Sequence, residues 1–131
     1  MVDDPAASLA AIAGVLRPGG HLSLLVAQRH AAVVARAMAG HFQAARELLD
    51  GDTTSRSGRR FTDAEVTDLL AAAGMQPTSV QAVRVFADLV PGSLLDLEPG
   101  ATAALVELER AVANRPEYLP LAAQLHVLAR R

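Results

Sequence analysis

The sequence predicts an α/β fold, in which helices alternate with strands and cover a sheet. Three observations carry this prediction. An Ala- and Leu-rich helical stretch stops at Pro-Gly-Gly, and the apolar run "HLSLLVAQ" follows at once at residues 21–28. A second helical pattern at 62–74 is followed by an alternating run at 78–86. The β-like run "QLHVLARR" occupies residues 124–131.

The first predicted helix and strand are bounded by clear local signals. Asp4-Pro5 begins the helix, because Asp caps an N-terminus well and Pro suits the first helical position. Pro18 ends the helix, and the two glycines after it can take the positive φ angles that turn the chain. Because the run at 21–28 is almost continuously apolar, we expect both faces of the sheet to be covered there.

The rest of the chain alternates in the same way. A helical pattern over 29–49 is bent or ended at Gly40, and the polar residues 50–60 form a predicted flexible surface loop. The remaining elements are predicted in this order: a helix at 62–74 with a capping box of Thr62 and Glu65, a strand at 78–86, about one helical turn within 91–100, a helix at 101–114 with Leu105, Leu108 and Val112 inward, a turn at 116–120 and a strand at 124–131.

Composition limits the classes of function. The 131 residues suit one domain at 1–131, and the net charge of −2 favours neither nucleic acid nor a membrane surface. The absence of cysteine excludes disulfides, thiolate metal sites and a catalytic thiol. The start "MVDDPAAS" has no signal-peptide pattern, and no apolar run is long enough to span a bilayer. We therefore expect a cytoplasmic protein.

Pro-Gly-Gly between a helix and a buried strand resembles the second half of class I methyltransferases, which use S-adenosylmethionine. "MAGHF", "FTDAEVTDLLAAAGM", "VRVFADL" and "PEYLPLAAQLHVLARR" then follow in that family's order. The set looks most like the tRNA 5-carboxymethoxyuridine methyltransferases and general methyltransferase-domain proteins. The resemblance implies the C-terminal half of a doubly wound, Rossmann-like sheet. This half would have about three strands, with the last one antiparallel and inserted between the other two, and helices on both faces.

The resemblance also predicts what this chain lacks. No G-x-G-x-x-G turn occurs, so no cofactor-binding residue is predicted and tight binding of S-adenosylmethionine is not expected. The chain would be a C-terminal fragment that contributes the substrate-side half of the enzyme and is not expected to act alone. A non-catalytic oligomerisation scaffold and a complementing subunit of a split methyltransferase are the alternatives. The family implies a tRNA or small-molecule acceptor.

Candidate substrate residues lie near the ends of predicted strands. Arg29 and His30 follow the run at 21–28, where the carboxyl end of a strand borders the ligand crevice of an open α/β sheet. In the resembling family this segment lines the substrate pocket, and an Arg also stands at the position of Arg84. Its fork-shaped guanidinium would suit a carboxylate, although structural pairing is the equal alternative. Tyr118 is a further candidate, with a turn anchor as the competing interpretation.

A basic loop is the candidate for contact with RNA phosphate. It contains Arg56, Arg59 and Arg60, and the matching loop of the resembling tRNA enzymes is also basic. The competing interpretation is a solvated loop, because the patch is short and has no interleaved aromatic residues. No catalytic triad, carboxylate pair or metal-ligand spacing occurs in the sequence, so no catalytic or metal-binding residue is predicted.

The predicted strand at 21–28 also has a consequence for assembly. In the resembling family a further strand lies beside it, and this chain does not encode that neighbour. A long, apolar, exposed edge promotes association. We therefore expect this edge to be covered by the same strand of a second copy, in a homodimer, or by another chain.

Overall fold

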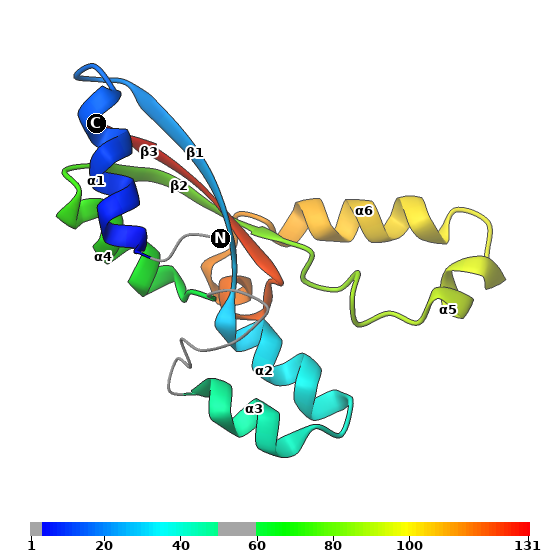
Figure 1. Ribbon diagram of the computed structural model, residues 1–131. Helices are drawn as coiled ribbons and strands as arrows, with labels where there is room; N and C mark the ends of the chain where they lie inside the picture. The colour runs from blue at the N-terminus through cyan, green and yellow to red at the C-terminus, as the bar shows by residue number, and fades with distance from the viewer. Residues whose placement is uncertain (1–3, 50–59) are drawn as a thin grey trace.

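The computed structural model describes residues 4–49 and 60–131 (Figure 1). Part of the predicted loop, residues 50–59, lies outside the described residues. Helices and strands alternate over most of the chain, as predicted. They are α1 (Pro5–Val15), β1 (His21–Ala27), α2 (Arg29–Met38), α3 (Phe42–Leu49), α4 (Asp63–Ala72), β2 (Gln76–Val83), α5 (Gly92–Leu97), α6 (Ala101–Val112), the 3₁₀ helix η1 (Pro116–Leu121) and β3 (Gln124–Arg130).

The local signals act as predicted. The Asp4 carboxylate accepts a hydrogen bond of 3.1 Å from the N–H of Ala7 and caps α1. At α4, the Glu65 carboxylate accepts from the Thr62 N–H at 2.9 Å, and the Thr62 hydroxyl accepts from the Glu65 N–H at 3.2 Å. This is the reciprocal capping box. Gly40, at φ 84°, separates α2 from α3.

The three strands form one sheet in the order β1-β3-β2. The prediction that 124–131 would pair with both 21–28 and 78–86 is confirmed: Leu24 and Val80 both face Val127. Both ladders are antiparallel, so the described strands form an entirely antiparallel sheet. The fold is therefore mixed α/β, whereas a doubly wound parallel sheet is not present among the described residues.

Helices cover one face of this sheet. On β3, Leu125, Val127 and Ala129 are buried, whereas the residues between them are partly or fully exposed. α4 packs against β2 and α1 packs against α4, on the same side of the sheet (Figure 1). In the described part of the chain the opposite face is open, with Leu25 55% exposed and Leu128 38% exposed.

The expectation of helices on both faces is therefore wrong for the described residues. The remaining helices project from the sheet instead of covering its second face. Figure 1 shows α2 and α3 as one hairpin below the strands. It shows α5 and α6 as an arm that extends to the right, away from α1 and α4. Because of this arrangement, the residues of β1 alternate in exposure even though the run is almost continuously apolar.

Two further predictions need correction. The second strand ends at Val83 and does not reach 86, because Arg84 takes the left-handed conformation at φ 57° and breaks the pleat. In α6, Val112 is buried as predicted, but Leu108 is 47% exposed. Most of α6 extends away from the sheet, so only its last turn reaches the core (Figure 1).

Candidate functional site

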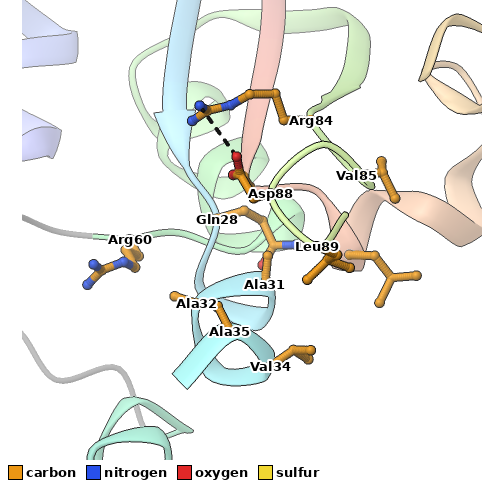
Figure 2. Close-up of a pocket in the computed structure, with 12 residues that line it drawn as sticks. Gln28, Ala31, Ala32, Val34, Ala35, Arg60, Arg84, Val85, Asp88 and Leu89 are labelled. Carbon is orange, nitrogen blue, oxygen red and sulfur yellow. Dashed lines mark ion pairs between the residues drawn. The ribbon is translucent and has the colours of Figure 1, made fainter. Parts of the chain in front are cut away.

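A pocket of about 230 Å³ lies beside the carboxyl ends of β1 and β2. Its walls come from α2, from the segment that follows β2, and from the end of η1. Figure 2 shows the Arg84–Asp88 pair at one end of the pocket and the small side chains of α2 below it. The lining residues are Gln28, Ala31, Ala32, Val34, Ala35, Arg60, Arg84, Val85, Asp88, Leu89, Leu121 and Ala123.

Gln28 joins the end of β1 to two other elements. Its side chain is 2% exposed, and its amide Nε2 donates to the carbonyl oxygen of Leu119 at 2.7 Å. Its Oε1 accepts from the backbone N–H of His30 and so caps α2. Both ends of this buried amide are therefore used by the fold, and Gln28 fixes the pocket wall instead of offering a group to a ligand.

Arg84 is the charged side chain at the top of the pocket. Its backbone has φ 57°, the one positive φ of a non-glycine residue in the described chain. Such a conformation is costly for a residue with a Cβ and is common at functional sites. Its Nη1 lies 3.8 Å from Oδ1 of Asp88, and both side chains are about half exposed, at 51% and 54%. This pair is loose enough for an anion to take over the guanidinium.

Glu109, on α6, holds the segment that follows Arg84. Its carboxylate accepts hydrogen bonds from the backbone N–H groups of Val85, Phe86 and Ala87 at 3.0, 3.1 and 3.3 Å. The carbonyl of Arg84 accepts from the N–H of Ala123 at 3.1 Å. Sequence reasoning missed Glu109, because a glutamate in a helical pattern gives no sign that it binds a loop elsewhere.

The pocket also has a basic side. Arg60 lines it, and burial lowers the pKa of the Arg60 guanidinium, with repulsion from Arg36 as the second cause. The Arg60 guanidinium still stays charged at neutral pH, since the pKa of Arg is far above it. Arg60, Arg84 and Asp88 are the charged residues in the lining of this otherwise largely apolar pocket.

The structure brings together only some of the predicted site residues. Arg84 and Arg60 line the pocket, whereas Arg56 and Arg59 lie outside the described residues. Arg29 does not line it, because its Nη1 is paired with the Glu65 carboxylate at 2.9 Å.

His30 and Tyr118 also lie outside the pocket lining. His30 is exposed in the first turn of α2 and contributes its backbone N–H to the Gln28 cap. The Tyr118 ring packs edge-on against Phe86, with 6.2 Å between the ring centroids, and belongs to the core. This position matches a turn anchor.

The glycines of the Pro-Gly-Gly turn are used by the backbone. Gly19 donates its N–H to the carbonyl of Arg131 at 2.9 Å, and Gly20 donates to Arg17 at 2.8 Å. They precede β1, so they do not form a strand-to-helix turn that could hold the methionine portion of a cofactor. The Pro-Gly-Gly turn itself therefore does not fit the methionine portion of S-adenosylmethionine.

Within 4–49 and 60–131, no group of three or more His, Cys, Asp or Glu residues is placed to hold a metal ion. No helix in that part of the chain has the length and apolarity needed to cross a membrane.

Comparison with the sequences of known proteins relates this chain to one class. Among models of protein families, none matches the chain. The chain is nevertheless a distant homologue of class I S-adenosylmethionine-dependent methyltransferases. The relative is the tRNA 5-carboxymethoxyuridine methyltransferase of Escherichia coli strain K12, which is 33% identical over 133 residues. The match covers 99% of this chain and 50% of that protein, so the chain spans about half the length of its relative.

Proposed function

We propose that this chain supplies the acceptor-binding, C-terminal half of an S-adenosylmethionine-dependent methyltransferase and does not transfer a methyl group by itself. The observation that carries the proposal is the pocket beside the carboxyl ends of β1 and β2, with Arg84 held over it in a left-handed conformation. The homology over half of the relative and the lack of a Gly-rich cofactor turn support it.

The acceptor we propose carries an anionic group. The guanidinium of Arg84 is about half exposed and is held only by a distant carboxylate, so it can form two parallel hydrogen bonds with a carboxylate. The apolar walls from α2 suit a flat ring or an aliphatic body. The relative is named for a carboxymethoxyuridine of tRNA, and such a nucleoside carries a carboxylate of this kind.

This arrangement suits methyl transfer, because that reaction needs few acid or base groups. The methyl donor is already activated when it is bound, and the rate depends mainly on how well the two reactants are aligned. The contribution of this chain is to hold and orient the acceptor and to exclude water from it. The donor requires a Gly-rich site that a complementing subunit or a further segment of polypeptide would supply.

Calorimetric titration separates the two parts of the proposal. S-adenosylhomocysteine should give no heat of binding with the chain alone, and micromolar binding would contradict the half-enzyme assignment. 5-Carboxymethoxyuridine should bind, whereas uridine and the methyl ester of the acid should bind at least about tenfold more weakly. Arg84→Gln should abolish that preference. The matched change Arg110→Gln, on exposed α6, should leave it intact. An unchanged preference in Arg84→Gln would overturn the assignment of the pocket.

A further inference from the structure

The peptide unit between Arg84 and Val85 is held at both of its ends. Its N–H belongs to Val85 and donates to Oε1 of Glu109 at 3.0 Å. Its carbonyl belongs to Arg84 and accepts from the N–H of Ala123 at 3.1 Å. Glu109 lies on α6 and Ala123 directly precedes β3, so two distant parts of the chain fix the orientation of this one peptide unit.

The held peptide unit keeps Arg84 in its left-handed conformation. The alternation of the sequence favours continuation of β2 through Arg84, and an extended residue has a negative φ. To return to that conformation from φ 57°, Arg84 would have to turn the peptide unit after it and give up the bond to Glu109 or to Ala123. A left-handed residue with a Cβ persists only where its surroundings hold it in this way.

The left-handed turn also decides where the Arg84 side chain points. Successive side chains of a strand point to opposite faces of the sheet. Val80 and Ala82 lie on the face that the helices cover, where both pack into the core. An extended Arg84 would place its guanidinium on that same apolar face. The turn directs it instead towards Asp88 and the pocket (Figure 2).

The wall of the pocket has supports that do not involve Glu109. The side chain of Val85 is 2% exposed, and that of Phe86 packs against the core. The carbonyl of Phe86 accepts from two N–H groups further along the segment, at 2.9 and 3.1 Å. Loss of the Glu109 carboxylate would therefore leave this wall in place while it frees the peptide unit that aims Arg84.

The end of α6 is anchored beside the end of β2. The N–H of Ala82 donates to the carbonyl of Ala113 at 2.8 Å, and Val112 is buried. Glu109 lies about one helical turn before Ala113, so this anchor brings its carboxylate to the residues that follow the strand.

We propose that Glu109 is the positioning residue for Arg84 and that it gives the acceptor pocket its preference for a carboxylate. Glu109 is not among the described residues that line the pocket, so it acts through Arg84 and not on the acceptor itself. It holds the peptide unit after Arg84, this unit holds the left-handed turn, and the turn aims the guanidinium. This role rests on the proposed function, because it sets the specificity of the same pocket.

Calorimetric titration of Glu109→Ala tests this role, with Glu107→Ala at an exposed position of the same helix as the matched control. In Glu109→Ala, 5-carboxymethoxyuridine should bind at least about tenfold more weakly than in the wild type, because the guanidinium no longer meets its carboxylate. The methyl ester should keep its affinity within about twofold, because the apolar walls stay in place. Glu107→Ala should bind both ligands as the wild type does.

The conservative variant Glu109→Gln distinguishes the geometry of Glu109 from its charge. Its amide oxygen can still accept from the N–H of Val85, so the preference for the acid should stay within about threefold of the wild type. A loss as large as that in Glu109→Ala would show that the charge sets the preference, and would contradict the positioning role.

The titrations also distinguish this role from the proposed function. A wild type that binds the acid and the ester equally would overturn the proposed function, and the role of Glu109 with it. A wild type that prefers the acid, together with an unchanged preference in Glu109→Ala, would overturn the role of Glu109 alone. An equal loss of both ligands in Glu109→Ala would assign Glu109 to the pocket as a whole and would also overturn it.

Amide hydrogen exchange tests the held peptide unit without any ligand. The N–H of Val85 should exchange at least about tenfold faster in Glu109→Ala than in the wild type, because its acceptor is gone. The N–H of Ala82, which is bonded to the carbonyl of Ala113, should keep its rate within about twofold. Unchanged exchange at Val85 would contradict the positioning role. Equal acceleration at Val85 and Ala82 would also contradict it, since α6 as a whole would then have detached.

Discussion

Gln28 and Leu119 are 91 residues apart in the sequence, yet the Gln28 amide donates to the Leu119 carbonyl at 2.7 Å. The same amide accepts from the N–H of His30. One buried side chain therefore fixes the end of β1, the start of α2 and the 3₁₀ helix η1 in relation to one another. These three elements form the floor and one wall of the pocket, so the shape of the pocket depends on this contact.

Replacing Gln28 with Leu should destabilise the protein by about 2 kcal/mol. The leucine side chain has a similar size, but it leaves the buried Leu119 carbonyl and the partly buried His30 N–H without their partner. Thermal unfolding measures the change. Gln81→Leu is the control, because Gln81 bonds Asn114 at an exposed position and its loss should cost under about 0.5 kcal/mol. Equal losses of stability in the two variants would show that the Gln28 hydrogen bonds contribute little to the free energy of unfolding.

Replacing Arg84 with Gly should stabilise the fold while it removes acceptor binding. A left-handed conformation costs a residue with a Cβ about 1–2 kcal/mol, and glycine adopts it freely. Part of this gain is offset by the greater freedom of glycine in the unfolded chain, so we expect a net gain of about 0.5 kcal/mol. The lost pair with Asp88 is exposed and contributes little. Chemical denaturation measures the stability of the variant, and calorimetry measures its binding of the acceptor. Lower stability in Arg84→Gly would mean that the Arg84 side chain stabilises the fold, and would contradict this prediction.

The sequence predicts those features of the fold that depend on residues close together in the chain. Asp4 at the start of α1, the Pro-Gly-Gly turn before β1, and the Thr62–Glu65 capping box are signals that act within a few residues, and each is found in place. Leu108 and Arg84 show the limit. Periodicity places Leu108 on an apolar stripe, but whether another element covers that stripe depends on where α6 projects. The alternation around Arg84 has the pattern of a strand, and only the tertiary contacts of its neighbours make the chain turn there.

The candidate site was predicted less completely than the fold, for the same reason. Arg84 and Arg60 could be singled out as charged residues near the ends of strands, and both line the pocket. Arg29 has the same sequence context, but its guanidinium is held by Glu65, which is 36 residues away. Glu109 anchors the segment after Arg84 from a helix whose position cannot be read from periodicity. The partners of a side chain, unlike its place along an element, are set by the tertiary fold.

Gly19, the first glycine of the Pro-Gly-Gly turn, should not tolerate a side chain. Gly19 has φ 81°, and a Cβ there would lie 3.6 Å from the Arg130 guanidinium. The contact is ordinary, so the cost of Gly19→Ala comes from the backbone and should be about 1–2 kcal/mol. Gly14→Ala is the matched control, since Gly14 lies in α1 with nothing near it and alanine favours a helix by about 0.5–1 kcal/mol. Denaturant midpoints should therefore move in opposite directions, and a shift of the same sign in both would contradict this account.

Glu65 links stability to pH. Burial alone would raise the pKa of its carboxyl group, but the hydrogen bond from the Thr62 N–H and the pairing with Arg29 outweigh it, and the pKa lies below the ordinary 4.5. Because the pKa is lowered, the carboxylate stabilises the folded state at pH values above its pKa in the unfolded chain. This stabilisation is lost as the pH falls through its pKa in the folded protein. Glu65→Gln keeps an oxygen that can accept from Thr62 but removes the charge that Arg29 binds.

This variant should be about 0.5–1 kcal/mol less stable than the wild type at pH 7, because Glu65 is partly exposed and solvent weakens the pair. The difference should shrink once the pH falls below the ordinary value of 4.5 and should vanish at still lower pH, where both proteins carry a neutral side chain. Urea unfolding at a series of pH values measures it. Asp68→Asn, at an exposed position on the same helix, controls for the general loss of a negative charge. A difference between Glu65→Gln and the wild type that stays constant down to low pH would show that the amide disturbs the capping box sterically and that the charge of Glu65 is not the cause.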